Sequence, residues 1–156
     1  MPFYILNINI GVDNSMYSKN EWGKLKKVVV GIADGAQVPE VDTSLRHINY
    51  ADVKDELDIP TGKYPQIVID EANEDLETFA DFLRNEGAEV VRPDITDCNY
   101  YNYCPRDSVI VYKDKAIATP MPLRARRNEY QAYEHHLENV HPYDIIRSDD
   151  LYNTNC

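Results

Sequence analysis

Glycine and long hydrophobic runs are scarce in this sequence, and each shortage excludes a class of protein. Only six of the 156 residues are glycine, and they form no phosphate-binding loop, dinucleotide-binding fingerprint or nucleophile elbow. No apolar run approaches the roughly 20 residues that a membrane-spanning helix needs. The opening residues also lack the basic flank and cleavage site of a signal peptide. We therefore expect no nucleotide cofactor and no membrane partner.

Positive charge is also scarce. Lys and Arg number 16 against 27 Asp and Glu, which gives a net charge of −11. Such a surface repels a phosphate polymer on average, so neither nucleic acid nor an anionic membrane is expected as a partner. The three cysteines are an odd number without a secretory signal, which favours a reducing, cytoplasmic location.

The rest of the composition is typical of a globular protein. Hydrophobic residues make up 43% of the chain and charged residues 28%, and a chain of this length buries roughly 70% of its surface. We expect a single domain over residues 1–156.

Short hydrophobic segments alternate with helical patterns. The β-branched run at 27–32 predicts a strand that is buried on both faces, and 89–92 predicts a second strand. Two further strands at 108–112 and 116–119 are expected to form a hairpin. With one helix after the first strand and another after the hairpin, this order indicates the α/β class.

The clearest pattern predicts a helix over residues 65–86. Its apolar stripe has spacings of three and four: Ile69, Ala72, Leu76, Phe79 and Leu83. Pro65 suits the first turn, and Gly87 suits the left-handed position beyond the end. A second helix is expected over 125–140, and the same spacing marks its buried side chains: Tyr130, Tyr133 and Leu137.

Two segments lack such a pattern. Residues 14–25 are polar around Trp22, and we expect a loop that docks Trp22 on the core. Residues 34–64 carry many acidic side chains without periodicity, and a long irregular excursion of this kind is often functional or mobile.

A tyrosine-rich segment, 98–104, leads directly into Pro105, Arg106 and Asp107. A carboxylate just before a strand lies at the mouth of the sheet, where it accepts both forked N–H groups of a guanidinium while tyrosines form a wall. A purely structural contact of Asp107 with Arg106 or with the backbone is the alternative, and composition alone favours it.

Three arginines, Arg124, Arg126 and Arg127, open the second predicted helix, where positive charge opposes the helix dipole. Acidic residues of the core, a partner or an anionic ligand group would hold them. A solvated cluster is the other hypothesis.

A metal site is not expected. Cys98 and Cys104 are not at the spacing of zinc ligands, and His135 and His136 point about 100° apart on a helix. The two histidines are expected on a solvated helix face, and Cys98 is expected to be a small buried hydrophobic residue.

Seven blocks carry a wider similarity, in order, along nearly the whole chain: 20–31 (NEWGKLKKVVVG), 65–93, 103–107 (YCPRD), 118–121 (ATPM), 124–126 (RAR), 129–133 (EYQAY) and 149–152 (DDLY). Together they resemble the amidinotransferases, the glycine and inosamine-phosphate enzymes. A local departure is Pro122 and Leu123, where the family usually has alanine and tryptophan. This change would reshape a pocket wall.

The resemblance implies an α/β-propeller of five ββαβ-type modules, the pentein fold, of which this chain corresponds to about the first two. Because members of the family are much longer, the chain is identified as an N-terminal fragment of such a propeller. A broken propeller exposes the edges of its modules, so we expect association with a complementary C-terminal chain or self-association.

The resemblance also implies a chemistry. In the family a cysteine thiolate attacks the guanidino carbon of a donor such as arginine, and an amine acceptor such as glycine then takes the amidino group. A histidine moves protons, and carboxylates hold the guanidinium. Only the aspartate of the Pro-Arg-Asp motif carries over, so Asp107 is expected to bind the guanidinium, with Arg106 as its structural neighbour.

No catalytic residue is expected in this chain, because the family's cysteine, histidine and second acid belong to later modules. Cys104 matches a non-catalytic position and is expected to be a packing residue. Cys156, the last of the 156 residues, is likewise not expected to be the nucleophile, because it would lack a following backbone to fix its rotamer or to supply hydrogen-bond donors.

The leading hypothesis is therefore an amidinotransferase that is inactive alone or forms one half of a split enzyme. The alternative is a non-catalytic module that binds guanidino compounds or a partner protein. A deiminase-type hydrolase of the same superfamily is a third hypothesis, and the blocks around Trp22 and at 104–107 favour the amidinotransferase branch.

Overall fold

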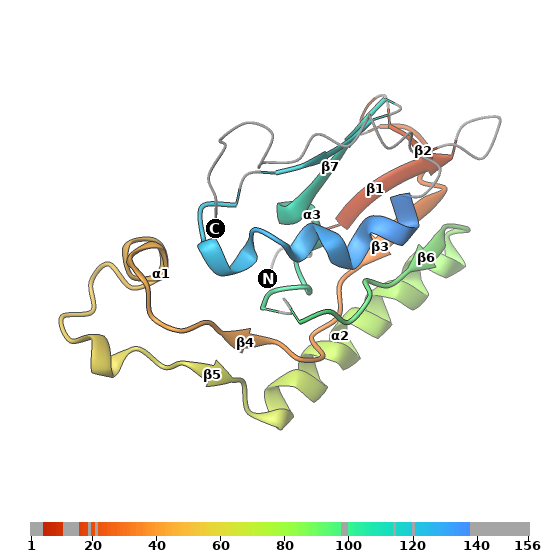
Figure 1. Ribbon diagram of the computed structural model, residues 1–156. Helices are drawn as coiled ribbons and strands as arrows, with labels where there is room; N and C mark the ends of the chain where they lie inside the picture. The colour runs from red at the N-terminus through yellow and green to blue at the C-terminus, as the bar shows by residue number, and fades with distance from the viewer. Residues whose placement is uncertain are drawn as a thin grey trace.

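A four-stranded sheet in the order β2–β1–β3–β6 is the largest sheet of the computed structural model, which describes residues 5–10, 16–18, 20, 22–97, 100–113, 115–119 and 121–137. Its strands are β1 (Ile5–Ile10), β2 (Met16–Tyr17), β3 (Lys27–Val30) and β6 (Glu89–Val91). Strand β1 runs antiparallel to both of its neighbours, whereas β3 and β6 are parallel. The helix α2 (Gln66–Asn85) lies between β3 and β6 in the chain (Figure 1), so β1, β3, α2 and β6 form one ββαβ unit.

Strand β3 is buried on both of its faces, as the sequence predicts. Val28 and Val30 pack into the cluster under α2, and Val29 packs into a second cluster on the opposite face. All three side chains are at most 1% exposed. The sheet and the helix α2 together confirm the mixed α/β class. The strand β3 ends at Val30 rather than at the predicted residue 32.

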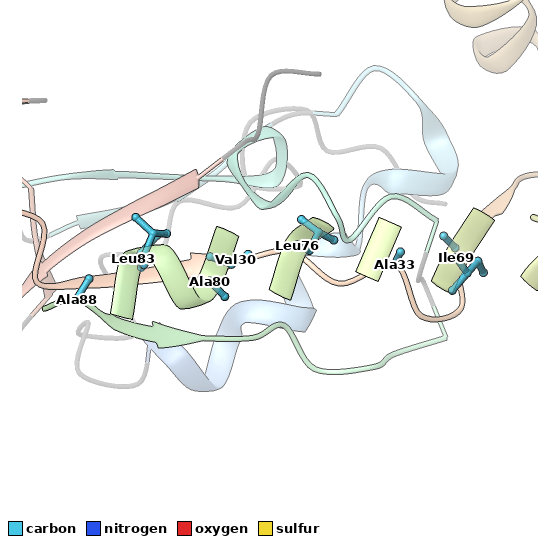
Figure 2. Close-up of a cluster of buried hydrophobic side chains, with 9 residues drawn as sticks. Val30, Ala33, Ile69, Leu76, Ala80, Leu83 and Ala88 are labelled. Carbon is cyan, nitrogen blue, oxygen red and sulfur yellow. The ribbon is translucent and has the colours of Figure 1, made fainter. Parts of the chain in front are cut away.

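The predicted helix 65–86 is confirmed as α2, with Pro65 and Glu86 as its caps. Its buried side chains are Ile69, Leu76, Ala80 and Leu83, with Ala72 and Phe79 packed at the edge of the same cluster. Figure 2 shows Ile69, Leu76, Ala80 and Leu83 along one face of the helix, beside Val30 and Ala33. Gly87 has a φ of 87°, the left-handed conformation expected beyond the helix end.

The excursion between residues 34 and 64 forms short elements rather than irregular chain. They are β4 (Gln37–Val38), α1 (Thr43–Asn49), the 3₁₀ turn η1 (Glu56–Asp58) and β5 (Gly62–Lys63), with β4 and β5 paired. They pack on a cluster from distant parts of the chain: Val38, Leu45, Ile59, Tyr101 and Leu123. Elements this short depend on tertiary packing, which local periodicity does not report.

The predicted hairpin is confirmed as β7 (Val109–Tyr112) and β8 (Lys115–Ala118). Ser108 was expected in its first strand, but it ends the short helix α3 (Pro105–Ser108) instead. The inner face of the hairpin packs on Val29 with Val109, Ala116 and Ala118. Ile110 and Tyr112 on the outer face are about half exposed, at 50% and 55%.

The predicted α-helix over 125–140 is wrong in type. The chain forms two 3₁₀ helices, η2 (Arg124–Arg126) and η3 (Glu129–Leu137), and residues 138–140 lie outside the described residues. Tyr130, Tyr133 and Leu137 are nevertheless buried as predicted. The spacing of three between the two tyrosines fits three residues per turn as well as 3.6, so the pattern did not separate the two helix types.

The expectation for Trp22 is also wrong. Its side chain is 86% exposed rather than docked on the core. The Oδ1 atom of Asn20 accepts hydrogen bonds from the backbone N–H groups of Trp22 and Gly23, at 3.0 and 2.8 Å. This local turn fixes the backbone without burying the indole. The strand β2 also begins within the segment that was expected to be a loop.

Gly31 permits a close approach that generates the first testable prediction. A Cβ atom at this position would lie 2.5 Å from Tyr103 Cα, a contact with backbone that a rotamer change cannot relieve. Gly31→Ala should therefore lower the free energy of unfolding by about 3 kcal/mol, as measured by urea titration. In the comparison variant Gly87→Ala, the added Cβ atom would have open space around it, and only the positive φ would be unfavourable. This variant should therefore lower the free energy of unfolding by only about 1 kcal/mol. A larger loss of stability in Gly87→Ala than in Gly31→Ala would contradict the close contact between Gly31 and the Tyr103 backbone.

Candidate functional site

The tyrosine-rich turn that follows β6 lies against the end of β3. The N–H of Ile32 donates to the Asn102 carbonyl at 3.2 Å, and the N–H of Cys104 donates to the Tyr101 carbonyl at 2.9 Å. The rings of Tyr101 and Tyr103 meet edge to face, with their centroids 5.7 Å apart. Because Gly31 has no side chain, this turn approaches the sheet closely enough to bring its tyrosines beside α3 and η2.

Two carboxylates share one guanidinium next to this turn. Arg126 in η2 donates from Nη1 to Asp107 Oδ2 at 3.0 Å and from Nε to Glu129 Oε2 at 2.7 Å. Its guanidinium also lies over the Tyr101 ring, 4.9 Å from the centroid, within the range of a cation–π contact. We refer to Asp107, Arg126 and Glu129 as the buried ion network.

Glu129 ties the network to the surrounding backbone. It is fully buried, and its Oε1 accepts the N–H of Tyr101 at 2.7 Å while its Oε2 also accepts the Ser108 hydroxyl at 3.2 Å. One carboxylate therefore joins the tyrosine turn, the end of α3 and the arginine of η2. Charge-assisted hydrogen bonds of this kind are stronger than neutral ones.

The electrostatics of the network follow from its burial. Burial raises the pKa of the Glu129 carboxyl, and the neighbouring Arg126 opposes that rise. Burial also acts against the charged guanidinium, but Glu129 and Asp107 outweigh it and raise the pKa of Arg126. Arg126 therefore stays charged, and the more exposed end of the network is Asp107, whose side chain is 35% exposed.

A cavity of about 250 Å³ lies beside the network. It is lined by Ile48 and Asn49 of α1, by Tyr101, Tyr103 and Cys104 of the turn, and by Met121, Pro122, Leu123 and Arg126. Burial raises the pKa of the Cys104 thiol to about 12 and that of the Tyr101 phenol to about 12. Both groups are protonated at neutral pH, and a protonated thiol is a poor nucleophile.

The structure resolves the contact of Asp107 that the sequence left open. Asp107 pairs with Arg126, 19 positions along the chain, and not with the adjacent Arg106, whose side chain is exposed. Of the alternatives for the arginine cluster, acids of the core hold Arg126. Sequence reasoning missed Glu129, although an arginine and a glutamate three residues apart are a recognisable helical pair.

Among the described residues, His135 and His136 have protein partners of their own. His135 Nδ1 contacts the Asp94 carboxylate and His136 Nε2 contacts the Arg92 carbonyl, and no group of three metal-ligating side chains occurs in the described part of the chain. His135 is exposed as expected, but His136 is partly buried, and burial lowers its pKa. Cys98 and Cys156 lie outside the described residues.

Curated relatives of the chain are amidinotransferases. It is 37% identical over 128 residues to inosamine-phosphate amidinotransferase 1 of Streptomyces glaucescens, which covers 74% of this chain and 37% of the relative. It is 31% identical over 129 residues to the mitochondrial glycine amidinotransferase of Xenopus tropicalis, over 74% of this chain and 31% of the relative. The chain thus spans about a third of the length of these relatives. No family model matches it.

Solved structures give the same result. The inosamine-phosphate amidinotransferase of Streptomyces griseus superposes with a TM-score of 0.77 and 33% identity, over 85% of this chain and 42% of that one. An amidinotransferase of the saxitoxin biosynthetic pathway of Microseira wollei superposes with a TM-score of 0.65 and 27% identity, over 80% of this chain and 40% of that one.

No helix in the described residues is long and apolar enough to cross a membrane.

The burial of Glu129 leads to the second testable prediction. Glu129→Ala leaves the Arg126 guanidinium without its deepest partner, and breaking a buried pair in this way costs about 3–5 kcal/mol. Urea titration followed by circular dichroism should report that loss in the free energy of unfolding. The control is Glu89→Ala, which removes the 3.0 Å pair with Lys27 from a half-exposed site and should cost less than about 1 kcal/mol. Equal costs would mean that the network does not stabilise the fold.

Proposed function

Because the chain belongs to the amidinotransferase family and spans about two fifths or less of the length of the members it matches, we propose that it supplies the guanidinium-binding part of an amidinotransferase site. In this proposal Asp107 is the carboxylate that holds the guanidinium of arginine or a similar guanidino compound. The observation that carries it is the pairing of Asp107 with a guanidinium inside the protein itself, that of Arg126.

Three features of the site support a guanidinium ligand at Asp107. The carboxylate is partly open to solvent, at 35% exposure, while its Oδ2 atom is held by Arg126. Arg126 is shared between Asp107 and a second carboxyl group, that of Glu129, so Asp107 binds only one of its nitrogens. The cavity beside the network is lined by Tyr101, Tyr103 and Arg126, and its volume of about 250 Å³ gives space for the rest of the ligand.

The proposed reaction moves an amidino group from an arginine-like donor to an amine acceptor such as glycine. A thiolate forms a bond to the guanidino carbon, and the bond from that carbon to the donor nitrogen breaks as the nitrogen takes a proton. The acceptor amine then forms a new carbon–nitrogen bond, loses a proton and releases the thiolate. The cysteine and the histidine for these steps would come from polypeptide outside these 156 residues, and carboxylates such as Asp107 share the positive charge.

We propose that the ββαβ unit of β1, β3, α2 and β6 is the first module of a propeller and that the β7–β8 hairpin begins the second. The half-exposed Ile110 and Tyr112 on the outer face of the hairpin support contact with further modules, from a complementary chain or from a second copy. A cytoplasmic location goes with the proposal as an expectation from the cysteine content.

A non-catalytic module that binds guanidino compounds is the second candidate. The raised pKa of the Cys104 thiol favours it, because this is the free cysteine within the described residues and it is poorly suited to attack. Asp107 would serve such a module in the same way, so binding and transfer have to be measured separately.

Arginine binding tests the role of Asp107. Calorimetry on the wild-type chain should detect arginine, and Asp107→Asn should weaken that binding at least tenfold, because the neutral amide loses the charge-assisted hydrogen bonds. Asp75→Asn removes the same charge from an exposed position on α2, none of whose residues lines the cavity, and should bind like the wild type. Unchanged affinity in Asp107→Asn would reject Asp107 as the guanidinium ligand.

A transfer assay separates the two candidates. The purified chain incubated with arginine and glycine should yield no guanidinoacetate. Addition of a polypeptide that corresponds to the remaining modules of an amidinotransferase should produce it if the chain is part of the enzyme. Binding without any transfer in the mixture would favour the non-catalytic module, and guanidinoacetate from the chain alone would contradict the proposed division of the site.

A further inference from the structure

Exposure rises in steps along the buried ion network. The Glu129 side chain is 0% exposed, that of Arg126 is 9% exposed and that of Asp107 is 35% exposed. Each side chain hydrogen-bonds the next, so the network runs from the core to a partly open end. Glu129 is therefore connected to the solvent-facing carboxylate of Asp107 through a single side chain, that of Arg126.

The inner end of this network is fixed in three directions. Glu129 receives hydrogen bonds from the Tyr101 backbone, the Ser108 hydroxyl and the Arg126 guanidinium. The Arg126 guanidinium is held further by its position over the Tyr101 ring. The nitrogen that reaches Asp107 thus belongs to an immobilised group, not to a flexible surface arginine.

Arg126 is poorly placed to bind an anionic ligand, although it lines the cavity. Two of its nitrogens are already held by carboxylates, and the third, Nη2, is buried and has no hydrogen-bond partner among the described residues. An anion approaching this guanidinium would also meet the carboxyl groups of Asp107 and Glu129. The partly exposed Asp107 is therefore the member of the network that is open to a ligand.

We infer that Glu129 and Arg126 are positioning residues for Asp107, an inference that rests on the proposed function. Glu129 fixes Arg126, and Arg126 holds Asp107 Oδ2, so that Oδ1 is presented in one orientation to the guanidinium of a bound ligand. An aspartate held in this way loses little conformational freedom on binding, which strengthens the complex.

A comparison of arginine with lysine tests this role. A guanidinium is a planar fork whose hydrogen bonds depend on the orientation of the carboxylate, whereas an ammonium group is a compact point charge. The paired variant Arg126→Met/Glu129→Gln removes both charges of the buried pair and keeps similar side-chain volumes, so no unpaired charge remains in the core. Circular dichroism and thermal unfolding establish that the variant is folded, and calorimetry gives its affinity for each amino acid.

The folded paired variant should bind arginine roughly tenfold more weakly than the wild type does, because Asp107 is no longer held in one orientation. Its affinity for lysine should stay the same or rise, so the ratio of arginine to lysine affinity falls. A purely structural role would leave this ratio unchanged. An unchanged ratio, or tighter arginine binding because an internal competitor has been removed, would overturn the inference.

The matched control is Arg84→Met/Asp81→Asn on α2, an exposed pair with the same spacing of three residues and a 2.6 Å contact. It should keep the wild-type ratio. If the paired variant does not fold, Arg126→Lys keeps the positive charge between the carboxylates but loses the fork, and its ratio should fall in the same way. Failure of the wild-type chain to bind arginine would reject the proposed function together with the inference. Binding by the wild type with an unchanged ratio in the folded variant would reject the inference alone.

Discussion

The guanidinium of Arg126, shared between Asp107 and Glu129, is the interaction on which the architecture of the site depends. It joins α3, η2, η3 and the tyrosine turn through side-chain hydrogen bonds. Burying these charges carries a large desolvation cost, which only close hydrogen bonding offsets. The network therefore favours one arrangement of the site, and the end that faces solvent is a carboxylate, Asp107.

A second constraint is the contact between Gly31 and the backbone of Tyr103. It brings the tyrosine turn against the end of β3, so that Tyr101 reaches both the Arg126 guanidinium and the hydrophobic cluster under α1. The sheet thus determines the position of the site through a backbone contact, and the ion network determines its electrostatics. The proposed binding of a guanidino compound depends on both.

The sequence predicted those parts of the fold whose signals are local. The helix α2 shows its stripe and its caps directly, and the β-branched run of β3 and the hairpin are equally local. The strand β1 also has a local signal, the alternation of apolar residues with asparagines. The exposure of Trp22 and the 3₁₀ form of η3 depend on tertiary contacts and on a spacing that fits two helix types. In the site, Asp107 was found through its motif, whereas its pairing with Arg126 depends on a contact across 19 positions of the chain.

The structure of the chain with bound arginine is the most direct test of this account. The account predicts that the guanidinium of the ligand donates to Asp107 Oδ1 while Arg126 Nη1 keeps its hydrogen bond to Oδ2. Arginine bound away from Asp107, or bound there after displacing Arg126 from the carboxylate, would contradict it.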